Sequence, residues 1–65
     1  MHVIINGQDT SLDGVATVGG LLGRLQLDGR IAVEINNEIV PRSEFDRFPV
    51  RDGDVIEIVR AIGGG

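Results

Sequence analysis

Aliphatic and polar residues alternate along several short segments of the chain, and alternation with a period of two is typical of half-buried β-strands. The clearest example is residues 31–36, where Ile31, Val33 and Ile35 occupy every second position and would therefore share one face of a strand. Residues 1–6 and 55–59 are similarly rich in isoleucine and valine, which favour strands. We expect strands in all three segments, with these side chains facing a core: Val3, Ile5, Ile31, Val33, Ile35, Ile56 and Ile58.

Turn-forming residues connect further strands to these. The Asn-Gly pair at residues 6–7 is a strong hairpin signal because both turn positions need a positive φ, and it predicts a returning strand at residues 8–12. The Asn-Asn pair at residues 36–37 predicts a second turn, followed by a short strand at residues 38–40. Pro41 ends that strand because it has no N–H to donate to a neighbouring strand.

A helix is predicted between the two hairpins. Thr17 suits its N-cap, and the Asp-Gly pair at residues 28–29 indicates its end. Residues 43–48 predict a helical turn that brings Phe45 to the core, and residues 52–54 predict the turn before the last strand. The apolar face of the helix has the i, i+3, i+4, i+7 spacing, with Val18, Leu21, Leu22 and Leu25.

This order of elements is that of an α+β fold of the β-grasp (ubiquitin-like) type. A mixed sheet of about five strands would pack on one helix, with the first and last strands parallel in its centre. We expect residues 1–59 to form this single domain and residues 60–65 to form a flexible tail that ends in Gly-Gly.

The opposite face of the sheet would be open. Residues that alternate with the core positions are Ile4, Ala32, Glu34, Val55, Glu57 and Val59. This face is more apolar than solvent exposure requires, which favours a docking surface. Stray β-branched residues on an open face are the alternative, because they suit strands. We interpret four residues as partner-docking positions: Ile4, Val55, Val59 and Arg60.

The composition excludes several classes of function. The 65-residue chain has a net charge of -4, six scattered arginines as its only Lys or Arg residues, and two phenylalanines as its only aromatic residues. Nucleic-acid binding needs a basic stripe and stacking platforms, so we expect no such partner. The chain has no cysteine, so it can form no disulfide, and a single histidine without further ligands does not make a metal site. No membrane-spanning run or signal-peptide pattern occurs, so we expect a cytoplasmic protein without a membrane partner.

The glycine tail carries the candidate chemistry. The sequence finishes with Ile62, Gly63, Gly64 and Gly65. Glycines offer a carboxylate with no neighbouring Cβ, which can be threaded into a narrow channel. A carboxylate is a poor electrophile, so this pattern suggests activation by an ATP-dependent enzyme. A frayed glycine end without function is the alternative.

Three segments resemble the ThiS family of sulfur carriers in thiamin biosynthesis. They are residues 37–42 (Asn-Glu-Ile-Val-Pro-Arg), residues 52–58 (Asp-Gly-Asp-Val-Ile-Glu-Ile) and the final Gly64-Gly65. The resemblance covers the whole chain. The Gly-Gly pair is common to ubiquitin-like carriers, whereas the first segment is more specific. Gly63 departs from the family, which more often has alanine there; the change leaves the chemistry intact but loosens the tail.

The resemblance implies a function and its partners. A ThiF-like adenylating enzyme would use ATP and magnesium to adenylate Gly65, and the adenylate would become a thiocarboxylate with sulfur from a donor protein. Thiazole synthase would receive that sulfur for the thiazole ring. Gly64 and Gly63 would let the tail pass the partner's entrance. The chain would bind no cofactor or metal and would act as a covalently modified substrate, not as an enzyme.

Two alternatives stay open. The small subunit of molybdopterin synthase has the same fold and tail but is usually longer. A β-grasp binding module with an inert tail would use the sheet face alone.

Overall fold

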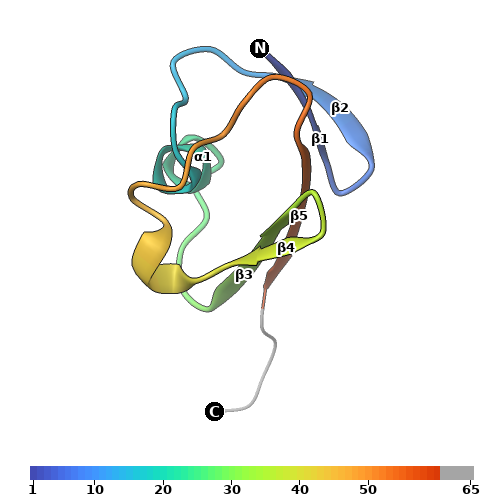
Figure 1. Cartoon of the computed structure of the whole chain (residues 1–65). Helices are drawn as coiled ribbons and strands as arrows, with labels where there is room; N and C mark the ends of the chain where they lie inside the picture. Colours follow the sequence, from blue (N-terminus) through green and yellow to red (C-terminus); the bar gives the residue numbers. More distant parts are fainter. Residues whose placement is uncertain (61–65) are drawn as a thin grey trace.

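The structure, a computed structural model, describes residues 1–60. Expectations about residues 61–65 therefore lie outside the described residues. Within residues 1–60, five strands, one α-helix and one short 3-10 helix follow one another (Figure 1). In chain order they are β1 (His2–Ile5), β2 (Gln8–Ser11), α1 (Val18–Arg24), β3 (Ile31–Ile35), β4 (Glu38–Val40), the 3-10 helix η1 (Arg42–Glu44) and β5 (Val55–Arg60).

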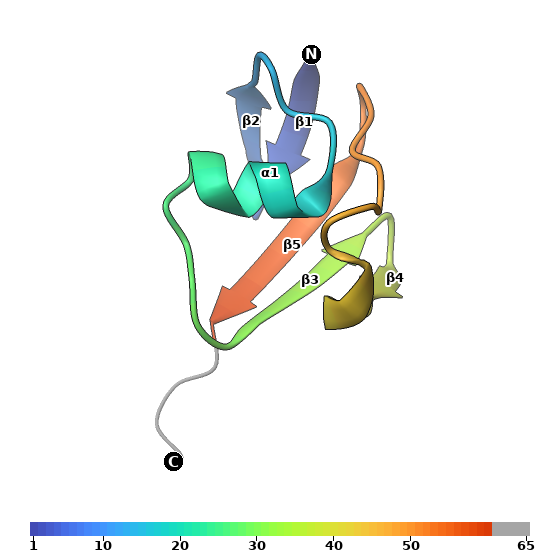
Figure 2. The ribbon, with the colours of Figure 1, turned by 90° about the vertical axis from the view of Figure 1, so that its left-hand side faces the viewer.

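The strands form one mixed sheet in the order β2-β1-β5-β3-β4. The first strand, β1, is parallel to the last, β5, while the β1–β2, β3–β4 and β3–β5 pairs are antiparallel. Helix α1 lies across one face of this sheet (Figure 2). The predicted β-grasp architecture is confirmed.

The core lies between α1 and the sheet. Helix residues Val18 and Leu21 are fully buried against strand residues Val3, Val33 and Ile56. The predicted inward face is confirmed, although two of its members are only partly buried and pack at the edge of the core: Ile5 and Ile58.

Helix α1 begins as predicted but ends earlier. The Thr17 side chain caps the start, since the Gly20 N–H donates to Thr17 Oγ1 over 3.2 Å. The helix ends at Arg24, so the expected end at residues 28–29 is wrong. Gln26 adopts a left-handed conformation with φ of 58°, which ends the helix there.

The hydrogen bonds at this end form a Schellman motif. The Gln26 N–H donates to the Gly23 carbonyl over 3.1 Å, and the Leu27 N–H donates to the Leu22 carbonyl over 2.9 Å. Glycine usually occupies the left-handed position of this motif. Because glutamine occupies it here, the usual sequence signal was missing.

The predicted turns are present. Asn6 and Gly7 both have positive φ values, 49° and 82°, as the hairpin requires. The 3-10 helix η1 begins at Arg42, one residue earlier than the predicted helical turn, and Phe45 packs against the core as expected. Strand β5 extends one residue beyond the predicted strand, because Arg60 pairs with Ile31 of β3.

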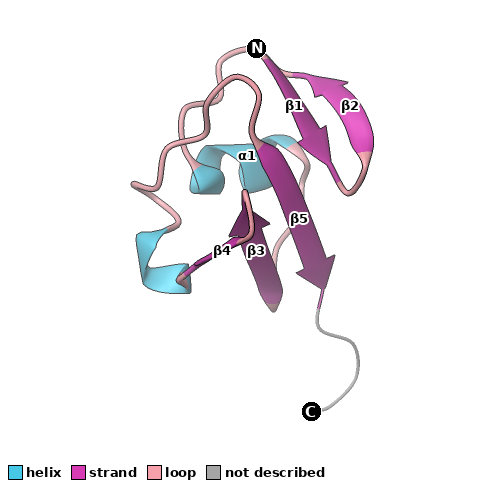
Figure 3. Ribbon diagram, turned by 45° about the vertical axis from the view of Figure 1, so that its right-hand side comes forward, coloured by secondary structure: helices cyan, strands magenta, loops and turns pink. Residues whose placement is uncertain are grey.

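Two asparagine side chains hold the central strand β5 in place. Asn6 Nδ2 donates to the Ile58 carbonyl over 3.1 Å, and the Ile58 N–H donates to Asn6 Oδ1 over 2.8 Å. The Val55 N–H donates to Asn36 Oδ1 over 2.9 Å. Strand β5 lies between β1 and β3 (Figure 3). Asn6 follows β1 and Asn36 follows β3, so an amide at the end of each flanking strand bonds to β5.

We predict that Asn6→Ala lowers the free energy of unfolding by about 1–2 kcal/mol more than Asn37→Ala does, measured by urea denaturation. Both residues have positive φ values, 49° and 68°, so both variants place alanine in a strained conformation. The two side chains differ in their contacts: within residues 1–60, the Asn6 side chain forms hydrogen bonds with β5, and the Asn37 side chain does not. Equal losses of stability would show that the Asn6 amide contributes nothing.

Candidate functional site

The open face of the sheet, on the side away from α1, contains three of the expected docking residues. Ile4, Val55 and Val59 are exposed by 37%, 44% and 61%. Ile4 is the register partner of Val55 in β1 and β5, and Val59 is the partner of Ala32 in β3. The outward orientation that the alternation predicted is confirmed, and the apolar residues form two clusters along β5.

Ile39 also belongs to this face, and the sequence analysis missed it. It is 70% exposed and pairs with Glu34 of β3, so it adds an apolar side chain to this face on the edge strand β4. Strand β4 has only three residues, which is too short for a clear alternation. The tight Asn-Asn turn could have indicated it, because a two-residue turn fixes which residues face each other across the hairpin.

Two carboxylates lie between the apolar clusters. Glu34 of β3 and Glu57 of β5 are register partners, and both are exposed. Like charges directly opposite each other on neighbouring strands repel. Neither glutamate has an ion pair within residues 1–60, where Arg47 and Glu44 form the one salt bridge. The centre of the open face therefore favours a partner surface that presents positive charge.

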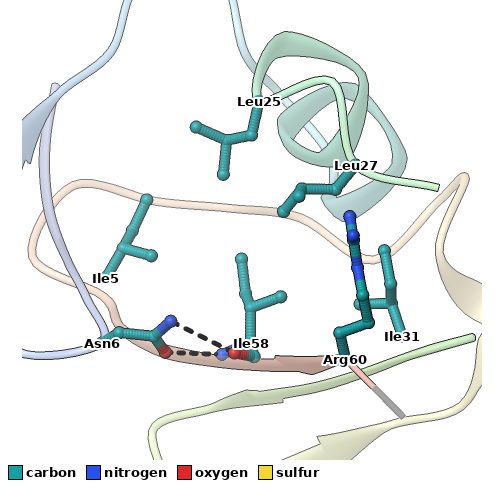
Figure 4. A pocket seen from close by; sticks show the side chains of 7 residues that line it. All are labelled: Ile5, Asn6, Leu25, Leu27, Ile31, Ile58 and Arg60. Atoms are coloured by element: carbon teal, nitrogen blue, oxygen red, sulfur yellow. Dashed lines mark hydrogen bonds between the residues drawn. The ribbon is translucent and has the colours of Figure 1, made fainter. Parts of the chain in front are cut away.

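Arg60, the fourth expected docking residue, lies on the other side of the sheet. Its register partner is the inward-facing Ile31, and its side chain extends toward Leu27, beyond the end of α1 (Figure 4). The structure does not bring Arg60 together with Ile4, Val55 and Val59. It lines a separate groove at the end of β5.

The glycines of the candidate chemistry, Gly63, Gly64 and Gly65, lie outside the described residues. Their position is limited by where β5 ends. From Arg60, the five following residues reach at most about 18 Å, at ~3.3–3.6 Å per residue. Any enzyme that acts on the Gly65 carboxylate must therefore approach the Arg60 end of the sheet.

The aspartates of residues 52–54 have structural roles. Asp52 Oδ1 accepts a hydrogen bond from the His2 N–H over 2.7 Å, and Asp54 Oδ2 accepts one from the Arg51 N–H over 2.8 Å. They fix the turn before β5. No group of three or more potential metal ligands occurs within residues 1–60. Within the same part of the chain, no helix is long and apolar enough to cross a membrane.

The fold, the exposed face of the sheet and the segment that continues beyond β5 define the class of ubiquitin-like β-grasp proteins. The chain belongs to the ThiS family: the model of that family matches residues 3–65. The sulfur carrier protein ThiS of Bacillus subtilis is 38% identical over 94% of this chain and 96% of its own length. A crystal structure of the thiamine biosynthesis protein ThiS from Geobacter metallireducens superposes with a TM-score of 0.86, at 35% identity and full coverage of both chains.

A longer relative is also similar. The thiazole synthase of Paramagnetospirillum magneticum is 48% identical to this chain over 66 aligned residues. The alignment covers the whole of this chain and 20% of the thiazole synthase. This chain therefore spans about a fifth of the length of that protein.

Proposed function

We propose that the chain is a sulfur carrier of thiamin biosynthesis whose Gly65 carboxylate is adenylated and then converted to a thiocarboxylate. One observation carries this proposal: the match to the ThiS family extends through Gly65. The relatives in Bacillus subtilis and Escherichia coli, which align over 94% and 100% of this chain, are both sulfur carrier proteins.

The chemistry divides between the carrier and its partners. Attack of a Gly65 carboxylate oxygen on the α-phosphorus of ATP forms an acyl adenylate and releases pyrophosphate, with the magnesium bound by the adenylating partner. The outer sulfur of a persulfide on a donor protein then attacks the carbonyl and displaces AMP, which gives an acyl disulfide between the donor and the carrier. A thiol then attacks the donor-side sulfur of this disulfide, so that a new disulfide forms and the thiocarboxylate is released on Gly65. The carrier needs no catalytic group of its own and is a covalently modified substrate.

The proposed partners are a ThiF-like adenylating enzyme, a sulfur donor protein and thiazole synthase. The similarity to one segment of a thiazole synthase supports the last of these. The acidic centre of the open face supports docking on a basic surface. The cytoplasm, where ATP is available, is the proposed compartment.

Gly64 and Gly63 would allow the tail to enter the narrow channel of the partner enzyme. Without side chains they allow the widest choice of φ and ψ and the narrowest cross-section. A partner can then enclose the end of the chain while the sheet stays outside its channel. Residues 60–65 are proposed to act as this tail, although Arg60 itself is the last residue of β5 and pairs with Ile31 of β3.

Pyrophosphate exchange tests the proposal. With Escherichia coli ThiF and Mg-ATP, the chain should support exchange of labelled pyrophosphate into ATP, and exchange should stop when either the carrier or magnesium is omitted. Binding to ThiF without exchange would instead favour a β-grasp binding module with an inert tail. Sulfur transfer to a molybdopterin precursor by the chain paired with a large subunit of molybdopterin synthase, with none to thiazole synthase, would place the carrier in the alternative pathway.

A further inference from the structure

A groove of about 350 Å³ lies on the helix side of the sheet, at the end of β5. Figure 4 shows Ile5 and Ile58 on the strand side, with Leu25 and Leu27 facing them from the segment that follows α1. These four side chains are partly exposed, and the more deeply buried Ile31 also lines the groove. Its surface is therefore mainly aliphatic.

The early end of α1 leaves this groove open. The helix stops at Arg24, and the left-handed Gln26 turns the chain away before another helical turn can cover the strands. Ile5 and Ile58 have the inward register of core residues but remain partly exposed. Their exposed aliphatic surface is available for contact with another molecule.

The rim of the groove has a fixed position and a positive charge. The two hydrogen bonds between Asn6 and the Ile58 backbone hold β5 beside the groove. Arg60, two residues further along β5, lines the groove, and within residues 1–60 it has no ion pair. This combination fits an aliphatic side chain with a carboxylate next to it.

We propose that the groove is a second docking site for the adenylating enzyme, which would insert an aliphatic side chain between Ile58 and Leu27 and present a carboxylate to Arg60. This inference rests on the proposed function. The enzyme that holds Gly65 must come within about 18 Å of Arg60, because five residues cannot reach further. The groove is at that same end of the sheet, so the enzyme is adjacent to it during the reaction.

The two docking sites differ in charge. The open face has Glu34 and Glu57 at its centre, whereas the groove has Arg60 at its rim. A partner that contacts both must present a basic surface to one and an acidic group to the other. This opposite pattern fixes the orientation of the carrier, because a rotated carrier would bring like charges together.

The test compares Arg60→Glu with Arg51→Glu, using Escherichia coli ThiF as the probe. Both variants make the same charge change at an exposed position, but Arg51 precedes the turn at the opposite end of β5. Arg60→Glu should weaken binding about tenfold or more, and Arg51→Glu about twofold or less. Equal effects would overturn the inference, because they would reflect overall charge alone.

Methyl NMR spectra identify the occupant. On addition of ThiF, the methyl signals of Ile5, Leu25 and Leu27 should shift or broaden; unchanged signals would overturn the inference. In the free carrier, shifts of these methyls caused by Ile62→Ala would show that the chain's own tail fills the groove. Shifts that depend on carrier concentration would show that a second copy fills it. Either result would also overturn the inference.

Pyrophosphate exchange separates this inference from the proposed function. At ThiF concentrations below saturation, Arg60→Glu should slow exchange about tenfold, whereas Arg51→Glu, at the opposite end of β5, should exchange within about twofold of the wild-type rate. A wild-type carrier that binds ThiF but supports no exchange would contradict the proposed function. Wild-type exchange combined with an unimpaired Arg60→Glu variant would contradict the groove site alone.

Discussion

Deletion of Gly65 should abolish formation of the thiocarboxylate while binding to the adenylating enzyme persists. Deletion moves the carboxylate back along the chain by one residue, about 3.5 Å. A misplacement of 1 Å at a reacting centre can lower the rate ~100-fold, so this larger shift should eliminate the reaction. Addition of one residue after Gly65 should have the same effect. Mass spectrometry of the product and a separate binding titration measure the two expected results.

A pair of substitutions in the tail provides the matched control. Gly64→Val should fail, because a branched side chain restricts φ and ψ and widens the segment that passes the channel. Gly63→Ala should remain active, because the methyl group of alanine adds little width and the resemblance to the ThiS family implies that alanine is accepted at this position. A Gly65-deleted carrier that still acquires sulfur would refute the carrier function. Loss of activity in Gly63→Ala would show that the channel is narrower than the family resemblance implies.

Ile56→Glu should unfold the domain, whereas its neighbour Val55→Glu should leave it folded. The Ile56 side chain is fully buried against α1, and Val55 lies on the open face. A buried carboxylate without a partner costs several kcal/mol. A domain of this size has a total stability of roughly 3–10 kcal/mol, at ~0.05–0.15 kcal/mol per residue. Circular dichroism and urea denaturation should therefore show loss of structure only for Ile56→Glu.

The folded variants then test docking on the open face. Ile4→Glu, Val55→Glu and Val59→Glu should each retain the fold but weaken binding to the adenylating enzyme, because each replaces an apolar side chain of the open face by a carboxylate that would lose its hydration in the interface. A stability loss for Val55→Glu equal to that for Ile56→Glu would contradict the assignment of the two faces. Unchanged binding in all three folded variants would contradict docking on the open face.

Local patterns predicted most of this fold. The alternation in β3 indicated both a strand and its buried face, and Thr17 indicated the start of α1, because these features depend on neighbouring residues. The end of α1 was not predictable from the usual signal, since Gln26 occupies a position where glycine is common. The groove beside β5 follows from that early end, so it could not be predicted from local patterns.

The part of the candidate site that depends on alternation within a single strand was also predictable. Alternation placed Ile4, Val55 and Val59 on the open face correctly. The pairing of Glu34 with Glu57 depends on the register between β3 and β5, which are distant in sequence, and alternation within one strand does not determine it. Ile39 was missed because β4 has only three residues, although the tight turn before it fixes its partner in β3. Arg60 was interpreted as the fourth docking position, but its pairing with the inward-facing Ile31 turns it to the helix side of the sheet.

Intact-mass analysis of the protein, isolated from cells short of thiamin, tests the central claim most directly. The carrier function predicts a second species in which one oxygen atom is replaced by one sulfur atom, and fragmentation should locate the change at Gly65. A thiazole synthase deletion should increase this species, because the sulfur is no longer consumed. A carrier that shows only its unmodified mass in both strains, with the adenylating enzyme and sulfur donor present, would contradict the account.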